Sequence, residues 1–261
     1  MRLRFRAGLT NDPSNERVYL GMDQALSLLG RPPSKFIAAM EQYPDKAGMR
    51  PELVYELLLH HAEAGDYAAA KNLLRNRFFP REEGGTNVRQ VYIEVEVQRL
   101  RTLADEGRCG PALDGMSQLG RPQTGMSFTQ DGLEPMIAAA RIQYEIGRID
   151  RACKRSAEAD VIFRRLAESK DGGDVTWAHA AAQMLPGYDA AAWQGRLTSA
   201  LAELKARAQS SSSARYNALV LERDLGNEAG SKEAYRGVFL TADQKLSYHL
   251  ARSAMAGMGM N

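Results

Sequence analysis

The chain has 261 residues, and its 34 lysine and arginine residues nearly balance its 32 aspartate and glutamate residues, which leaves a formal net charge of +2. This balance excludes a strongly basic nucleic-acid binder and an acidic tail, because both need a lopsided charge, and we expect no nucleic-acid partner. Hydrophobic residues make up 44% and charged residues 25%, as in a folded globular chain. The length allows one large domain, two small ones or a repeat array.

The first fifteen residues are predicted to lie outside the main domain. Residues 1–6 alternate arginine with apolar side chains, which favours a strand, and Asn11-Asp12-Pro13 is typical of a turn. We interpret residues 1–15 as a strand-like remnant or a disordered arm. The basic start lacks the roughly 7–15 apolar residues of a secretion signal, and no stretch approaches the roughly 20 that cross a bilayer. These absences predict a cytoplasmic protein with no membrane partner.

From residue 16 onward the apolar residues recur at helical spacing, which predicts an all-α domain over residues 16–256. The one competing pattern is in residues 91–97, where four β-branched side chains favour a strand. That pattern continues through Ala104, which is longer than one strand usually runs, so a helix is favoured there.

Glycines recur at nearly regular intervals between these helices. Six of them each end one helical pattern and precede the next: Gly30, Gly65, Gly107, Gly147, Gly187 and Gly226. A glycine after the last helical turn adopts the left-handed conformation at the lowest cost. The turn of the unit after Gly107 can be placed in two ways, because residues 154–159 with Phe163 fit it as well as Gly147 does. In that second placement a helix over about residues 133–153 contains Gly147, so the register around residues 133–169 stays open.

A fixed period of helix–turn–helix units is typical of an α-solenoid. The spacing predicts about six helical hairpins, and residues 241–255 form one more helix that caps the array. The tail, residues 257–261, is predicted to be disordered.

Residues 51–79 resemble a tetratricopeptide repeat. Tyr55 and Leu58 precede the turn Ala64-Gly65-Asp66-Tyr67, and Ala70 and Leu74 follow it, near the positions of that family's large and small packing residues. The resemblance covers roughly residues 50–240 and implies a stack of hairpins with a concave groove. The period here is longer than the family's roughly 34 residues.

A second resemblance extends over most of the chain. Residues 19–25, 75–90 and 128–135 look like the helical tail of large bacterial proteins that join a β-rich domain, related to sugar mutarotases and of unknown function, to tetratricopeptide repeats. This resemblance implies a β-rich, carbohydrate-related partner domain, which the present sequence lacks.

No motif predicts a catalytic residue, a cofactor or a metal. His60 and His61 are adjacent and point about 100° apart on a helix, so they cannot hold one ion together, and His179 and His249 have no ligand partner nearby in sequence. Cys109 and Cys153 are too few for a disulfide framework, and we expect them to be packing residues in a reducing compartment.

Two sets of residues are candidates for binding. Counting back from each turn glycine gives the concave face of the first helices, where arginine and aromatic side chains supply binding energy. Its candidates are Tyr55, Gln98, Arg101, Arg141, Tyr144, Trp177, Tyr216, Asn217 and Arg223. A loop after Pro80 provides a second candidate, a polar or anion site, whose residues are Arg81, Glu82, Glu83, Asn87 and Arg89. The alternative for that loop is a structural ion-pair network.

The sequence therefore favours a non-catalytic scaffold that binds a protein or an extended peptide along its groove. The alternative is an accessory helical domain that supports a separate β-rich catalytic domain. An enzyme in its own right has little support, because no acid–base pair or nucleophile emerges.

Overall fold

The structure is a computed structural model that describes residues 8–79, 86–130, 132–169, 174–240 and 245–256. Within these ranges the regular elements are helices, and the only β-type pairing is an isolated bridge between Gln123 and Met126, so the all-α prediction is confirmed. Residues 8–11 are helical and not strand-like, whereas residues 1–7 and the predicted tail lie outside the description. None of the described helices is long and apolar enough to cross a membrane.

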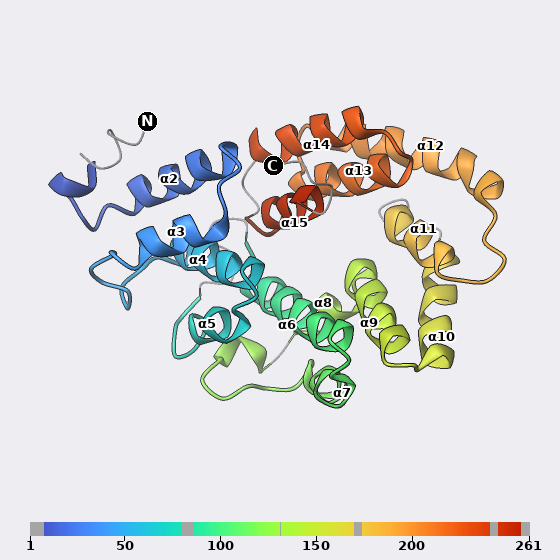
Figure 1. Cartoon of the computed structure of the whole chain (residues 1–261), viewed down its shortest axis with the longest axis horizontal. Coiled ribbons are helices and arrows are strands. Elements are labelled where there is room, and N and C mark those ends of the chain that lie inside the picture. Colours follow the sequence, from blue (N-terminus) through green and yellow to red (C-terminus); the bar gives the residue numbers. More distant parts are fainter. Residues whose placement is uncertain (1–7, 80–85, 131, 170–173, 241–244, 257–261) are drawn as a thin grey trace.

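The helices follow one another around the molecule (Figure 1). Their bounds are α2 (Glu16–Leu28), α3 (Pro33–Met40), α4 (Pro51–Glu63), α5 (Tyr67–Asn72), α6 (Val88–Asp105), α7 (Cys109–Gln118), α8 (Glu134–Ala138), α9 (Ala140–Ala152), α10 (Ser156–Ala167), α11 (Val175–Gln183), α12 (Ala190–Arg207), α13 (Ser212–Asp224), α14 (Glu228–Leu240) and α15 (Lys245–Ala256), with a 3-10 turn at Ser127–Thr129. The helix expected over residues 91–104 is confirmed as part of α6, and the side chain of Asn87 caps it.

Six of the described helices contact one another in a closed sequence. Helix α4 packs on α6, α6 on α9, α9 on α11, α11 on α13, α13 on α15, and α15 packs back on α4. We call these the inner helices. Helices α5, α7, α10, α12 and α14 pack against them from outside, as Figure 1 shows. Thus α15, which the sequence assigned to capping the end of an array, joins the last helices to the first ones.

The turn residues separate the two placements that the sequence allowed. Gly30, Gly65, Gly107, Gly187 and Gly226 all have positive φ, as expected at helix ends. Gly147 instead lies inside α9, and Lys154 occupies the turn with a φ of 62°. The second placement is therefore correct for the turn. Its helix begins later than expected, because the helix is interrupted at Ala139, between α8 and α9.

Gly147 serves packing and not a turn. A Cβ atom at this position would lie 2.7 Å from Cε1 of Phe163, a side chain of α10 that is fully buried. The absence of a side chain lets α9 and α10 approach closely, and this close contact accounts for the glycine.

Cys109 and Cys153 form a disulfide that joins the start of α7 to the end of α9. The prediction that the two cysteines are merely packing residues in a reducing compartment did not foresee this bond. No sequence pattern predicts this pairing, because the two cysteines are 44 residues apart and meet only when α7 and α9 both pack on α6. Disulfides are typical of oxidising compartments, so the cysteines no longer support the expected reducing compartment.

Candidate functional site

A pocket of about 590 Å³ lies among the inner helices, each of which contributes to its wall. We call it the central pocket. Of the nine groove candidates, seven line it: Gln98, Arg101, Arg141, Tyr144, Trp177, Tyr216 and Arg223. Tyr55 does not, because its ring is buried and stacks on Phe79 at 5.5 Å between ring centroids. Asn217 is absent from the lining too, and its backbone carbonyl lies 3.5 Å from the hydroxyl of Thr176.

Sequence reasoning missed Glu145 and Arg148, which also line the pocket. Both lie on the face of α9 that carries Arg141 and Tyr144, at helical spacing. The groove face was found by counting back fixed numbers of residues from each turn. Counting back ten, nine and six residues from Lys154, instead of from Gly147, reaches Tyr144, Glu145 and Arg148. The signal was present in the sequence, and the misplaced turn hid it.

Arg141 is held in place by groups behind the pocket wall. Its Nε donates to Oε2 of Glu94 at 3.0 Å, and its Nη2 contacts Oε1 of the same carboxylate, which is 2% exposed. Gln98 also donates to Glu94, at 2.9 Å. The guanidinium carbon of Arg141 lies 5.6 Å from the centre of the Trp177 ring, so charge and stacking both fix its orientation.

Glu145 is a buried carboxylate surrounded by arginines. It is 6% exposed, and guanidinium nitrogens of Arg101, Arg141 and Arg148 each lie 3.6 Å from one of its oxygens. That distance is longer than a hydrogen bond, and neither Oε2 of Glu145 nor Nε of Arg101 has a hydrogen-bond partner. Arg101 and Arg148 therefore keep donors that another anion can use.

Aromatic rings form the part of the wall beside Arg141. The ring of Trp177 lies 5.7 Å from that of Tyr144 and 6.2 Å from that of Tyr216, measured between centroids. Burial raises the pKa of both tyrosines, so their hydroxyls stay protonated at neutral pH. Nearby, Arg223 lies 3.5 Å from Asp224. Burial raises the pKa of Asp224, and the interactions with Arg223 and His179 offset this rise only in part.

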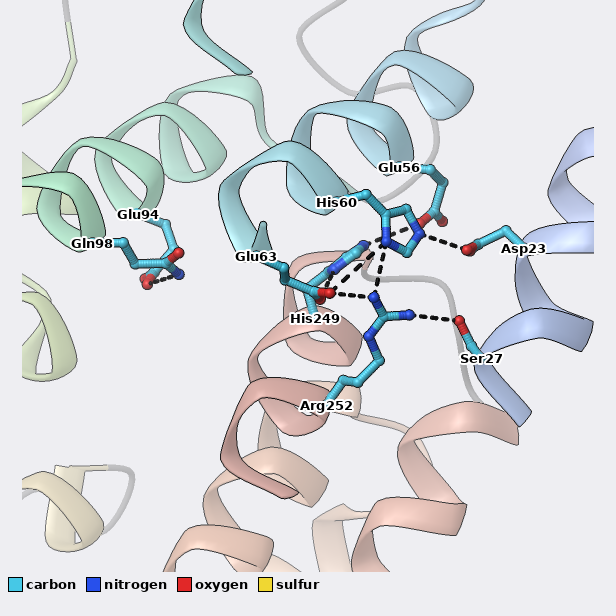
Figure 2. A network of polar contacts seen from close by, with 9 residues as sticks. All are labelled: Asp23, Ser27, Glu56, His60, Glu63, Glu94, Gln98, His249 and Arg252. Atoms are coloured by element: carbon cyan, nitrogen blue, oxygen red, sulfur yellow. Dashed lines mark hydrogen bonds and ion pairs between the residues drawn. The ribbon is translucent and has the colours of Figure 1, made fainter. Parts of the chain in front are cut away.

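A second polar cluster lies where α15 meets α2 and α4, and Figure 2 shows its side chains pointing toward one another. We call it the seam network, and its members are Asp23, Ser27, Glu56, His60, Glu63, His249 and Arg252. Helix α2 supplies the first two, α4 the next three and α15 the last two. The network joins the two ends of the described chain.

His60 has a partner on each ring nitrogen. Nη2 of Arg252 lies 2.9 Å from Nδ1 and can only donate, so Nδ1 is the acceptor and the proton is on Nε2. Nε2 then donates to Oδ1 of Asp23 at 2.6 Å. Burial lowers the pKa of His60 well below its usual value, and the charges of His249 and Arg252 lower it further. Burial and the neighbouring Glu56 raise the pKa of Asp23 to about 8.

His249 lies between two glutamates. Its Nε2 is 3.1 Å from Oε2 of Glu56, and its Nδ1 bonds Oε1 of Glu63. Burial alone lowers the pKa of His249, but the two carboxylates overcome this effect and raise it to about 9. Burial likewise opposes ionisation of Glu63, yet His249 and Arg252 bring its pKa down to about 2. Arg252 bonds Glu63 and donates to Ser27 at 2.8 Å.

His249 has no ligand partner nearby in sequence, but the fold brings distant ones to it. Glu56, His60 and His249 each offer a ligand atom, and these atoms lie within 4.8 Å of one another. His249 and Glu56 are 193 residues apart, so no local spacing could reveal the cluster. His60 and His61 do diverge as expected, since Nδ1 of His61 lies 3.5 Å from Asp66.

The predicted loop site is described only in part. Arg81, Glu82 and Glu83 lie outside the described residues. Asn87 accepts from the backbone N–H of Arg89 at 2.9 Å as the cap of α6, and Nε of Arg89 donates to the carbonyl of Phe128 at 3.1 Å. The two described members thus support the local structure.

Comparisons with known proteins found no matching family model, no matching curated protein and no matching solved structure.

Proposed function

We propose that the chain is a non-catalytic helical scaffold, built of tetratricopeptide-like hairpins, whose central pocket binds an acidic peptide segment of a partner protein. The observation that carries this proposal is the group of three arginines at 3.6 Å from Glu145. Arg141 is anchored on Glu94, whereas Arg101 and Arg148 lie near Glu145 without hydrogen-bonding it. Their guanidinium groups keep donors for a second carboxylate, which a guanidinium can bind with two parallel hydrogen bonds.

The charge of the wall favours an acidic ligand. Arg101, Arg141, Arg148 and Arg223 line the pocket, and Glu145 and Asp224 oppose them there. The remaining acidic residue of the lining, Glu63, is engaged by His249 and Arg252. A ligand carboxylate therefore meets an excess of positive charge.

The aromatic rings favour a peptide over a small inorganic anion. Trp177, Tyr144 and Tyr216 offer contiguous ring surface beside the arginines, and arginine and large aromatics carry most of the binding energy at protein interfaces. A volume of about 590 Å³ holds a few side chains and not a folded domain.

Selection from a displayed peptide library, followed by titration of the purified chain with the selected peptides, tests this function. Trp193→Phe leaves Trp177 as the sole tryptophan and turns it into a fluorescent reporter of the pocket. We expect selected peptides to be rich in Asp and Glu beside an apolar residue and to change the Trp177 emission. Arg148→Glu should weaken binding at least tenfold, because it places a like charge opposite the ligand carboxylate.

Arg108→Glu is the matched control, because Arg108 is an exposed arginine outside the pocket that pairs with Glu106. It should leave the affinity within a factor of two. Enrichment of basic or uncharged peptides, or equal losses in Arg148→Glu and Arg108→Glu, contradicts the proposal.

A further inference from the structure

The seam network holds a set of groups that suits a transition metal ion. Asp23, Glu56, His60 and His249 are 2%, 2%, 1% and 3% exposed. Two imidazoles and two carboxylates in one buried place form the mixed nitrogen and oxygen ligand set of Zn²⁺ and similar divalent ions.

Three of the groups, Glu56, His60 and His249, face a common point, and Asp23 adjoins them through its bonds to His60 and Glu56. Nε2 of His249 lies 3.1 Å from Oε2 of Glu56, and Nε2 of His60 lies 2.6 Å from Oδ1 of Asp23. The two carboxylates close the circle through a hydrogen bond between Asp23 and Glu56. The rings of His60 and His249 are edge to face, with centroids 5.0 Å apart, so each Nε2 can exchange its present carboxylate bond for a bond to an ion between them.

The distances require small adjustments of three ligands and a larger movement of Asp23, which lies outside the close group. Ligand atoms around a tetrahedral Zn²⁺ are about 3.4 Å apart, given bonds of about 2.0–2.1 Å. The ligand atoms of Glu56, His60 and His249 already lie within 4.8 Å of one another, so side-chain rotations suffice to bring them together. Asp23 and His60 must separate by somewhat less than 1 Å from their present hydrogen bond.

Glu63 occupies the position of an outer-sphere group. Metal-bound histidines usually donate their second ring N–H to a carboxylate, which fixes the ring and its tautomer. Oε1 of Glu63 bonds Nδ1 of His249, and its Oε2 lies 3.8 Å from Nδ1 of His60. One carboxylate thus stands behind both imidazoles, on the side away from Asp23 and Glu56 (Figure 2).

We infer that the chain binds one divalent transition metal ion, preferentially Zn²⁺, through Asp23, Glu56, His60 and His249. When the ion binds, the Nε2 proton of His60 moves to Nδ1, which turns from Arg252 toward Glu63. The protons on Nε2 of His249 and on the carboxyl of Asp23 are released to solvent, and Arg252 keeps its contacts with Glu63 and Ser27. Because the ligands come from α2, α4 and α15, the ion ties the last helix to the first ones.

The test uses the full chain after removal of metal with a chelator. Titration with ZnCl₂, followed by calorimetry and by elemental analysis after dialysis, should give one equivalent per chain. His60→Asn and His249→Asn should abolish stoichiometric binding, and Glu63→Gln should weaken it by about 10–100-fold, as loss of an outer-sphere carboxylate does. His61→Asn is the matched control, because it alters the neighbouring residue of the same helix and should bind as the wild type does.

Co²⁺ provides a readout that needs no variant. Bound to the wild-type chain, it should give the intense visible absorption of a four-coordinate nitrogen and oxygen site, and one equivalent of Zn²⁺ should remove that absorption. The inference is overturned if the folded wild type retains no stoichiometric Zn²⁺, or if His61→Asn reduces binding as much as His60→Asn does. Peptide binding at the central pocket is measured separately, so the two proposals can fail independently.

Discussion

His179 illustrates how burial alone sets the charge of one side chain. It is 2% exposed, its Nε2 lies 2.8 Å from the hydroxyl of Tyr188, and its Nδ1 has no hydrogen-bond partner. The nearest carboxylate, that of Asp224, is 3.9 Å from Nδ1. Burial lowers the pKa of His179, and Asp224 offsets this only in part. The folded protein therefore keeps this imidazole neutral.

This depressed pKa predicts a loss of stability in acid. As the pH falls below about 6.5, the unfolded chain takes up a proton at His179 before the folded chain does, so protonation favours unfolding. Above that pH the residue contributes no pH dependence. Urea unfolding at pH 5 and pH 8 should show that the wild type loses more free energy of unfolding on acidification than His179→Gln does.

Gln183→Ala serves as the control, since it removes a neighbour of His179, 3.3 Å away, and leaves the titrating group in place. It should retain the pH dependence of the wild type. Equal acid sensitivity in the wild type and His179→Gln contradicts the assignment, because every other titrating group is common to both.

At the scale of the element, the sequence predicted helices well and one turn poorly. The spacing of apolar residues identified α6 against its β-branched composition, and five of six turn glycines have the expected positive φ. Gly147 was wrongly assigned to a turn, because the sequence alone does not distinguish a glycine that ends a helix from one that lets two helices pack closely. Lys154 takes the left-handed turn despite its Cβ, and no propensity rule selects a lysine there.

The disulfide between α7 and α9 yields a prediction about stability. Breaking it frees a segment whose ends are 44 residues apart in the unfolded chain, and loss of such a cross-link typically costs about 2–4 kcal/mol of unfolding free energy. Dithiothreitol should lower the free energy of unfolding of the wild type, measured by urea denaturation, by this amount. The double variant Cys109→Ser/Cys153→Ser should unfold like the reduced wild type and respond no further to the reductant. An oxidised wild type that unfolds identically with and without dithiothreitol contradicts the assignment.

At the scale of the whole molecule, closure of the inner helices was the feature that the sequence could not predict. A repeat pattern describes how each hairpin packs on the next, whereas the contact between α15 and α4 joins segments that no period relates. The same limit hid the seam network, whose bonds span up to 225 residues. The central pocket was easier to predict, because its wall repeats one helix face from hairpin to hairpin.

Polar side chains of the seam network connect α15 to α4 and α2. Arg252 and Glu63 have side-chain exposures of 13% and 11%, and each has further partners in the network. Removing one member of such a pair leaves the other charge buried without its partner, which typically costs about 3–5 kcal/mol. The loss should be local to the seam, because the contacts between α9, α10 and α11 do not involve these residues.

Arg252→Gln should therefore open the seam before the rest of the molecule unfolds. With a chelator present to exclude metal, amide hydrogen exchange should become faster in α15 and in α2, while α10 keeps the protection of the wild type. Lys232→Gln is the matched control, because it breaks the exposed ion pair with Glu228 on α14, and screened surface pairs of this kind contribute little. If exchange accelerates equally in all helices, the seam network is part of one cooperative unit. If exchange is unchanged in α15, the polar contacts do not hold the inner helices closed.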